Sequence, residues 1–67
     1  MKRNYYISKN GTLQRKDNSL NFKIEDGDHK YIPVEDVDSL YIFGEVTLNT
    51  KLINFLSQNG VILHFFN

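Results

Sequence analysis

The carboxyl-terminal third of the chain constrains the fold most, because it reads as strand, helix and strand with a glycine at each junction. Residues 39–43 form a short apolar run that ends at Gly44, which is typical of a central strand covered on both faces. An apolar stripe then recurs at helical spacing, on Leu48, Leu52, Phe55 and Leu56, with Ile53 widening it. We therefore expect an amphipathic helix packed on one face of a sheet.

The two ends of this helix indicate how the flanking strands pair. Thr47 or Asn49 can cap its first turn, and Gly60 can end it in the left-handed conformation. Gly60 directly precedes the apolar run 61–66, so the helix is the crossover between two strands. Strands 39–43 and 61–66 are therefore predicted to be parallel neighbours.

The first 34 residues predict a meander of four strands. Residues 4–8 and 12–16 flank Asn10-Gly11, a strong hairpin signal because both residues tolerate positive φ. Residues 17–19 supply the next turn.

The third and fourth strands follow from alternation. Leu20, Phe22 and Ile24 alternate with polar residues, the pattern of a strand with one buried face. The turn 25–28 leads into strand 29–34, where Pro33 favours a sheet edge. Together these patterns predict one β-rich domain over residues 1–67, in the mostly β (α+β) class. It would be a small β-sandwich or roll-like meander of about six strands, with one amphipathic helix between the last two.

The small size of the chain predicts association with a partner. With 67 residues it buries only ~60% of the surface that the unfolded chain exposes, so its core is small. It has no cysteine, which excludes disulfides and cysteine-containing zinc sites. Four tyrosines and five phenylalanines supply apolar surface that a second copy or a following domain can bury. The apolar run 61–66 also has to be buried, which again predicts association with a partner.

The cations are concentrated at the amino terminus. Five of them precede any carboxylate, while the rest of the chain carries three lysines and eight carboxylates. With Tyr5 and Tyr6 between them they can contact phosphates, or they can lie on a solvated edge hairpin whose lysines discourage pairing with other sheet edges. The candidate phosphate contacts are Lys2, Arg3, Lys9, Arg15 and Lys16.

The chain has no signal-peptide core and no apolar run of the roughly 18 residues that span a bilayer. We therefore expect a cytoplasmic protein without a membrane partner. The acidic and histidine side chains are better explained as turn or core residues than as ligands or acid–base groups. Those side chains are Asp26, Asp28, His29, Glu35, Asp36, Asp38 and His64. No catalytic, cofactor-binding or metal-binding residue is predicted.

Five segments in order carry a resemblance to a known family. They are residues 4–7 (NYYI), 10–13 (NGTL), 31–37 (YIPVEDV), 43–51 (FGEVTLNTK) and 60–67 (GVILHFFN). The chain resembles, over its whole length, the amino-terminal domain of the CRISPR-associated adaptation integrase, an endonuclease. Subtype I-B is the most similar.

The resemblance implies a β-rich amino-terminal domain followed by a helical catalytic domain that binds Mg²⁺ or Mn²⁺ through glutamate, histidine and aspartate. Those ligands would lie beyond Asn67, so none is assigned here, and the domain has no cofactor of its own. The resemblance also implies that the chain forms a homodimer. Two such homodimers would flank a dimer of a second CRISPR adaptation protein, which holds the new DNA spacer. The 67 residues are then an inactive scaffold of the spacer-acquiring enzyme in antiviral defence.

Physical reasoning adds a candidate interface for that homodimer, formed by sheet residues near Tyr41, Phe43 and Phe65. Two alternatives stay open. The first is a stand-alone small module that binds single-stranded nucleic acid or another protein, and the second is a self-contained metalloenzyme.

Overall fold

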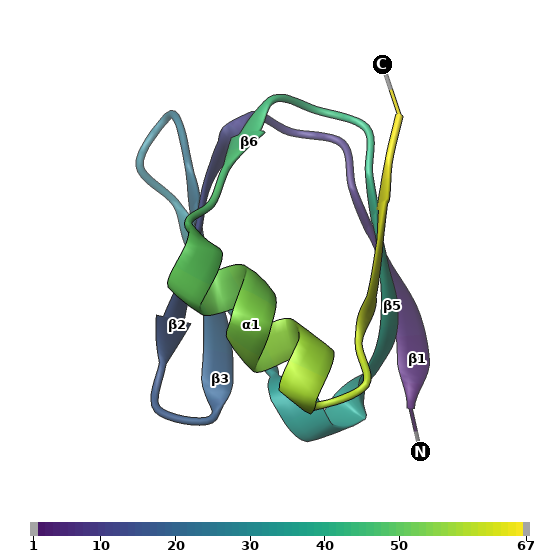
Figure 1. The fold of residues 1–67 in the computed structure, drawn as a ribbon. Coiled ribbons are helices and arrows are strands. Elements are labelled where there is room, and N and C mark those ends of the chain that lie inside the picture. The colour runs from purple at the N-terminus through teal and green to yellow at the C-terminus, as the bar shows by residue number, and fades with distance from the viewer. Residues whose placement is uncertain (1, 67) are drawn as a thin grey trace.

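The computed structural model describes residues 2–66, which form two small sheets with one helix across them (Figure 1). Sheet A contains β1 (Arg3–Ile7), β5 (Val37–Ile42) and β7 (Ile62–Phe65). Sheet B contains β4 (His29–Pro33), β3 (Ser19–Ile24), β2 (Gly11–Lys16) and β6 (Val46–Thr47). The 3-10 turn η1 (Val34–Asp36) precedes β5, and the helix α1 (Thr50–Gln58) precedes β7. The predicted mostly β class with a helix between the last two strands is confirmed, with seven strands in two sheets.

Sheet A is entirely parallel, and β5 is its central strand. Ser39 lies opposite Ile62 and Ile42 lies opposite Phe65, so the predicted pairing across the helical crossover is confirmed. On the other side of β5, β1 pairs in register with Tyr6 opposite Tyr41. A parallel pair needs a long connection, and residues 8–36 provide one by forming most of sheet B.

The predicted hairpin between residues 4–8 and 12–16 is wrong, because these two strands belong to different sheets. Asn10 and Gly11 do not close a turn. The Asn10 carbonyl accepts from Glu25, its side-chain oxygen accepts from the Glu45 amide at 2.8 Å, and the Gly11 amide donates to the Glu45 carbonyl. This segment therefore carries the chain from sheet A to sheet B.

The other two predicted turns are confirmed, and they leave β2, β3 and β4 as an antiparallel meander of three strands. Asp17 takes a positive φ of 55° between β2 and β3, and Gly27 takes one of 107° between β3 and β4. The alternation along β3 predicted its buried face correctly, since Leu20, Phe22 and Ile24 all lie in the core.

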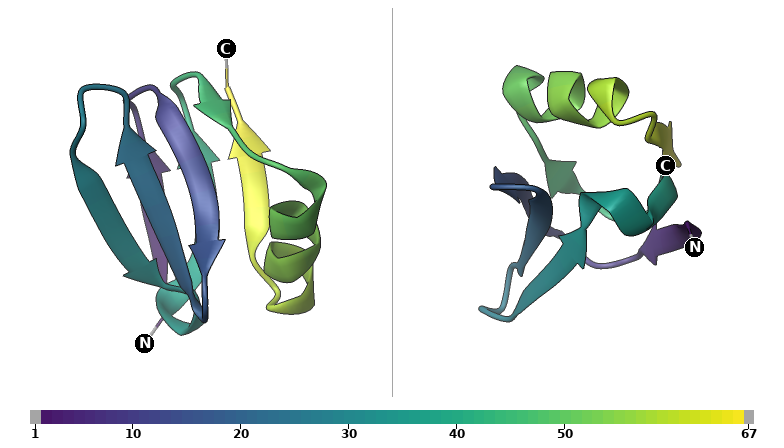
Figure 2. Two further views of the ribbon diagram at one scale, coloured as in Figure 1. Left: turned by 90° about the vertical axis from the view of Figure 1, so that its left-hand side faces the viewer. Right: turned by 90° about the horizontal axis from the view of Figure 1, so that it is seen from below.

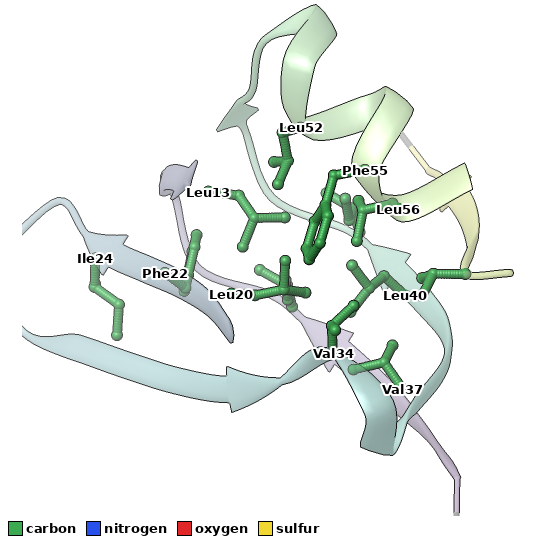
Figure 3. Close-up of a cluster of buried hydrophobic side chains, with 13 residues drawn as sticks. Leu13, Leu20, Phe22, Ile24, Val34, Val37, Leu40, Leu52, Phe55 and Leu56 are labelled. Atoms are coloured by element: carbon green, nitrogen blue, oxygen red, sulfur yellow. The ribbon is translucent and has the colours of Figure 1, made fainter. Parts of the chain in front are cut away.

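The core fills the space between the two sheets and the helix (Figure 3). Leu52, Phe55 and Leu56 on α1 are buried against it, and the view from below shows α1 spanning one side of the sheet pair (Figure 2). Ile53 is 41% exposed, so it does not widen the buried stripe as expected.

Both helix ends follow the sequence pattern. The Asn49 side chain accepts a hydrogen bond from the Leu52 amide at 2.9 Å, which identifies Asn49 as the N-cap residue instead of Thr47. Gly60 has a φ of +71°, as expected for a residue that ends a helix in the left-handed region. Within residues 2–66, no helix is long and apolar enough to cross a membrane.

Candidate functional site

The outer face of sheet A carries five stacked rings, which we call the aromatic face: Tyr6, Tyr41, Phe43, His64 and Phe66. They come from three parts of the chain that the sheet brings together. Tyr6 lies opposite Tyr41, and Tyr41 lies opposite His64, so one row of rings crosses all three strands. Their neighbours Ile7, Leu40 and Ile42 are buried in the core, because successive side chains of a strand point to opposite faces.

The rings form a continuous layer. Tyr41 lies 5.0 Å from Tyr6 and 4.6 Å from His64, measured between ring centroids, with interplanar angles of 17° and 6°. Phe43 lies 4.8 Å from Phe66 at 15°. Such stacked pairs hold each other in fixed orientations, so the aromatic face is ordered before any partner binds.

Much of this layer is open to solvent. Tyr6 is 65% exposed, Phe43 50% and Phe66 43%, and the adjacent Ile62 on the same face is 56% exposed. None of these side chains carries a formal charge at neutral pH. A contiguous apolar surface of this kind on a small domain marks an interaction site for another apolar surface.

The structure brings together two of the three predicted interface residues. Tyr41 and Phe43 lie on the aromatic face, whereas Phe65 is in register with the buried Ile42 and so lies on the other face of sheet A. Sequence reasoning missed Tyr6, His64 and Phe66 as members of the face, and His64, expected to be a turn or core residue, stacks on Tyr41 on the outer side. Strict alternation along β7 would have separated Phe65 from Phe66 and grouped Phe66 with His64.

Tyr5 and Tyr6 divide as adjacent strand residues must. Tyr5 packs against the core, and Tyr6 belongs to the aromatic face.

The five predicted phosphate contacts come from different elements of the fold. Lys2 and Arg3 lie at the start of β1 in sheet A, Lys9 lies in the crossing segment at the other end of β1, and Lys16 ends β2 in sheet B. Arg15 is engaged within the fold: its Nε donates to the Asp17 carbonyl at 2.8 Å, and its guanidinium lies 3.9 Å from the centre of the Phe55 ring. The five cations thus belong to different elements, and their role in phosphate binding stays a prediction.

The acidic and histidine residues give no ligand set in the part of the chain that the structure describes. Among residues 2–66, no three histidine or carboxylate side chains converge on a point where a metal ion would fit. The residues present do not suit the Mg²⁺ or Mn²⁺ that the family resemblance implies, so no chemical step is assigned to them.

The described residues form a small β-rich domain with an exposed aromatic face. Residues 5–67 match the family model described as CRISPR associated protein Cas1, and the chain belongs to this family. Subtype I-B stays a prediction.

Curated relatives agree with this assignment. A protein described as CRISPR-associated endonuclease Cas1 3, from Thermodesulfovibrio yellowstonii, is 57% identical over 65 residues, which are 97% of this chain and 20% of the relative. CRISPR-associated endonuclease Cas1 from Fusobacterium nucleatum is 48% identical over 67 residues, again 20% of that protein. The chain thus spans about one fifth of the length of these relatives.

Two solved structures share the fold. A Cas1 protein from Thermotoga maritima superposes with a TM-score of 0.89 at 46% identity, over 97% of this chain and 21% of that one. A structure described as a TtCas1-DNA complex superposes with a TM-score of 0.71 over 87% of this chain and 22% of that one. At 15% identity, the second likeness concerns the fold alone.

Proposed function

We propose that this chain is the amino-terminal dimerisation domain of a Cas1-type DNA endonuclease and integrase, and that it acts as a scaffold. Membership of the family and the share of the relatives that it spans support this placement. The whole protein would be a metal-dependent enzyme, using Mg²⁺ or Mn²⁺, that inserts new spacers in the cytoplasm together with a second adaptation protein. The relatives' description as endonucleases supports the DNA chemistry.

The aromatic face is the observation that carries the scaffold role. Tyr6, Phe43 and Phe66 are stacked with their neighbours and exposed, so a second copy related by two-fold symmetry can bury apolar surface against them. A small domain gains stability when such a surface is buried. Arg15, one of the five cations, is held by the Phe55 ring and the Asp17 carbonyl, which favours this role over a nucleic-acid-binding module.

The experiment is analytical ultracentrifugation of the 67-residue chain and of the double variant Phe43→Ser/Phe66→Ser. The unaltered chain should be a dimer at tens of micromolar. Each ring, about half exposed, would bury roughly 100 Å² in each copy, so removing both should weaken the dimer on the order of 100-fold or more.

The matched control is Ile53→Ser, which removes a comparably exposed apolar side chain from α1, away from the aromatic face. Its dimer should be unchanged. A monomeric unaltered chain at these concentrations, or equal weakening by both variants, would contradict the proposed interface. Circular dichroism spectra of all variants establish that the fold is retained.

A further inference from the structure

A groove lies on the side of the molecule where β1 of sheet A and β4 of sheet B are both edge strands. Its cavity has a volume of about 470 Å³. Tyr5, Phe22, Ile24 and Ile32 contribute its apolar lining, and all four side chains belong to the hydrophobic core or pack against it. The helix covers a different side of the sheet pair, so here the core reaches the surface.

The edge of β1 facing away from β5 has free backbone groups. The Ile7 carbonyl accepts from the Phe43 amide at 2.8 Å, so the backbone groups of Ile7 point to β5. Alternate residues of a strand point their backbone groups in opposite directions, so those of Asn4 and Tyr6 point away from β5. Among the described residues no strand pairs with this edge.

The free edge of β4 ends in a proline. The Ile24 amide donates to Asp28 and the Val34 amide donates to Asn18, which places the backbone groups of Lys30 and Ile32 towards β3. His29 and Tyr31 therefore point outwards. Pro33, which ends β4, has no amide hydrogen to donate. β1 is thus the better template for an added strand.

The charged residues that line the groove have one sign, and the carboxylates of Glu25 and Asp26 belong to the adjacent hollow. Lys9 and Lys30 line the groove, and no carboxylate is among its lining residues. Tyr6 and Tyr31, which are 65% and 58% exposed, also line it. An occupant that places carboxylates beside these lysines is favoured electrostatically.

We propose that this groove binds an extended peptide segment that adds to β1 as a strand, with apolar side chains at alternate positions and acidic side chains at one end. The alternate apolar side chains would pack on the groove, the acidic end would lie beside Lys9 and Lys30, and the peptide backbone would pair with Asn4 and Tyr6. A nucleic acid has no strand backbone to pair with these amides and carbonyls, so a peptide fits the site better. The groove and the proposed dimer interface share Tyr6, whereas Tyr41, Phe43, His64 and Phe66 of the aromatic face are not among the groove's lining residues.

The test begins with a random library of twelve-residue peptides displayed on phage and selected on the 67-residue chain. The selected peptides should carry apolar residues at alternate positions, acidic residues towards one end, and no proline at their centre. The best peptide is then made with a fluorescent label, and its affinity is measured by fluorescence anisotropy. Hydrogen exchange at the Tyr6 amide should become slower when it binds.

Charge-reversal variants and N-methylated peptides distinguish strand addition from nonspecific binding. The double variant Lys9→Glu/Lys30→Glu should weaken binding at least tenfold and improve binding of a counterpart peptide with lysine in place of its acids. The control Lys23→Glu/Lys51→Glu, with the same charge change outside the groove, should bind the acidic peptide within about threefold of the unaltered chain. N-methylation of alternate peptide amides, which removes backbone donors and keeps the side chains, should also weaken binding at least tenfold.

Several outcomes would overturn the proposal. One is that no peptide is selected, and another is that the selected peptides are basic or have a central proline. A third is that Lys9→Glu/Lys30→Glu or N-methylation leaves the affinity unchanged. Displacement of the peptide by a fifteen-residue oligothymidine would assign the groove to nucleic acid instead. Hydrogen exchange at the Tyr6 amide is also measured in the absence of peptide. If protection there increases with protein concentration and persists in Phe43→Ser/Phe66→Ser, the groove is assigned to a second copy.

Discussion

The ring of Tyr41 lies 4.6 Å from the imidazole of His64, and the two planes differ by only 6°. The two residues are direct partners on β5 and β7, and Tyr41 stacks at its other side on Tyr6 of β1. Tyr41 therefore connects all three strands of sheet A on the solvent side, opposite the core.

The Tyr41–His64 stack should contribute to stability even in a single copy of the chain. We expect a double-mutant cycle with Tyr41→Ala and His64→Ala to give a coupling free energy of about 0.5–1.5 kcal/mol, the usual range for an aromatic pair. The measurement is urea unfolding followed by circular dichroism, at a protein concentration low enough that association does not add to stability.

Ile62→Ala is the control for this cycle, since Ile62 is on the same strand and face as His64 and is 56% exposed. Paired with Tyr41→Ala it should show no coupling beyond about 0.5 kcal/mol. A coupling as large as that of His64 would mean that general apolar contact, and not the stack, holds the ring of Tyr41.

Gly11 should not tolerate a side chain, for a reason other than turn geometry. A Cβ at this position would overlap the backbone carbonyl oxygen of Lys23, its neighbour across the β2–β3 pair. Gly11→Ala must push two paired strands apart, so we expect a loss of about 1–3 kcal/mol in the free energy of unfolding, measured in urea.

The adjacent change Thr12→Ala, also on β2, is the control for Gly11 and should cost clearly less. If Gly11→Ala proved as stable as the unaltered chain, the close approach of β2 and β3 would have to be looser than the structure shows.

Arg15 should act in stability and not in phosphate binding. Arg15→Ala removes the cation–π contact with Phe55 and the hydrogen bond to the Asp17 carbonyl, and we expect a loss of about 1 kcal/mol in the free energy of unfolding. Lys16→Ala, next to it on an exposed position, should stay within about 0.5 kcal/mol. Urea unfolding tests both. If Arg15→Ala left the free energy of unfolding unchanged but weakened binding to DNA, Arg15 would be a phosphate contact after all.

Local patterns predicted those parts of the fold whose cause is local. The stripe of Leu52, Phe55 and Leu56 has the helical period, so its buried face follows from geometry alone. The alternation of Leu20, Phe22 and Ile24 likewise fixes which side of β3 meets the core. The parallel pairing of β5 and β7 also followed, because a short strand–helix–strand unit has few other arrangements.

The partner of β1 could not be read in the same way. Asn10-Gly11 is a genuine turn signal, yet in this chain it carries the backbone from one sheet to the other, and β1 pairs with β5 across an interval of about 30 residues. A local turn signal shows only which backbone conformations a segment can adopt. The partner strand of β1 depends on which distant strand allows Tyr5 and Ile7 to be buried.

The sequence by itself determined the class of the fold, the buried side of the helix and of β3, and membership of the Cas1 family. Only the tertiary structure decided that Tyr6, Tyr41, Phe43, His64 and Phe66 form one surface, that Phe65 lies on the opposite face, and that Arg15 packs on Phe55. The reason is physical. Alternation along a strand sets which face of the sheet a side chain lies on, whereas the register between strands sets which side chains it contacts across the sheet. Register between distant segments is fixed only when the whole core closes.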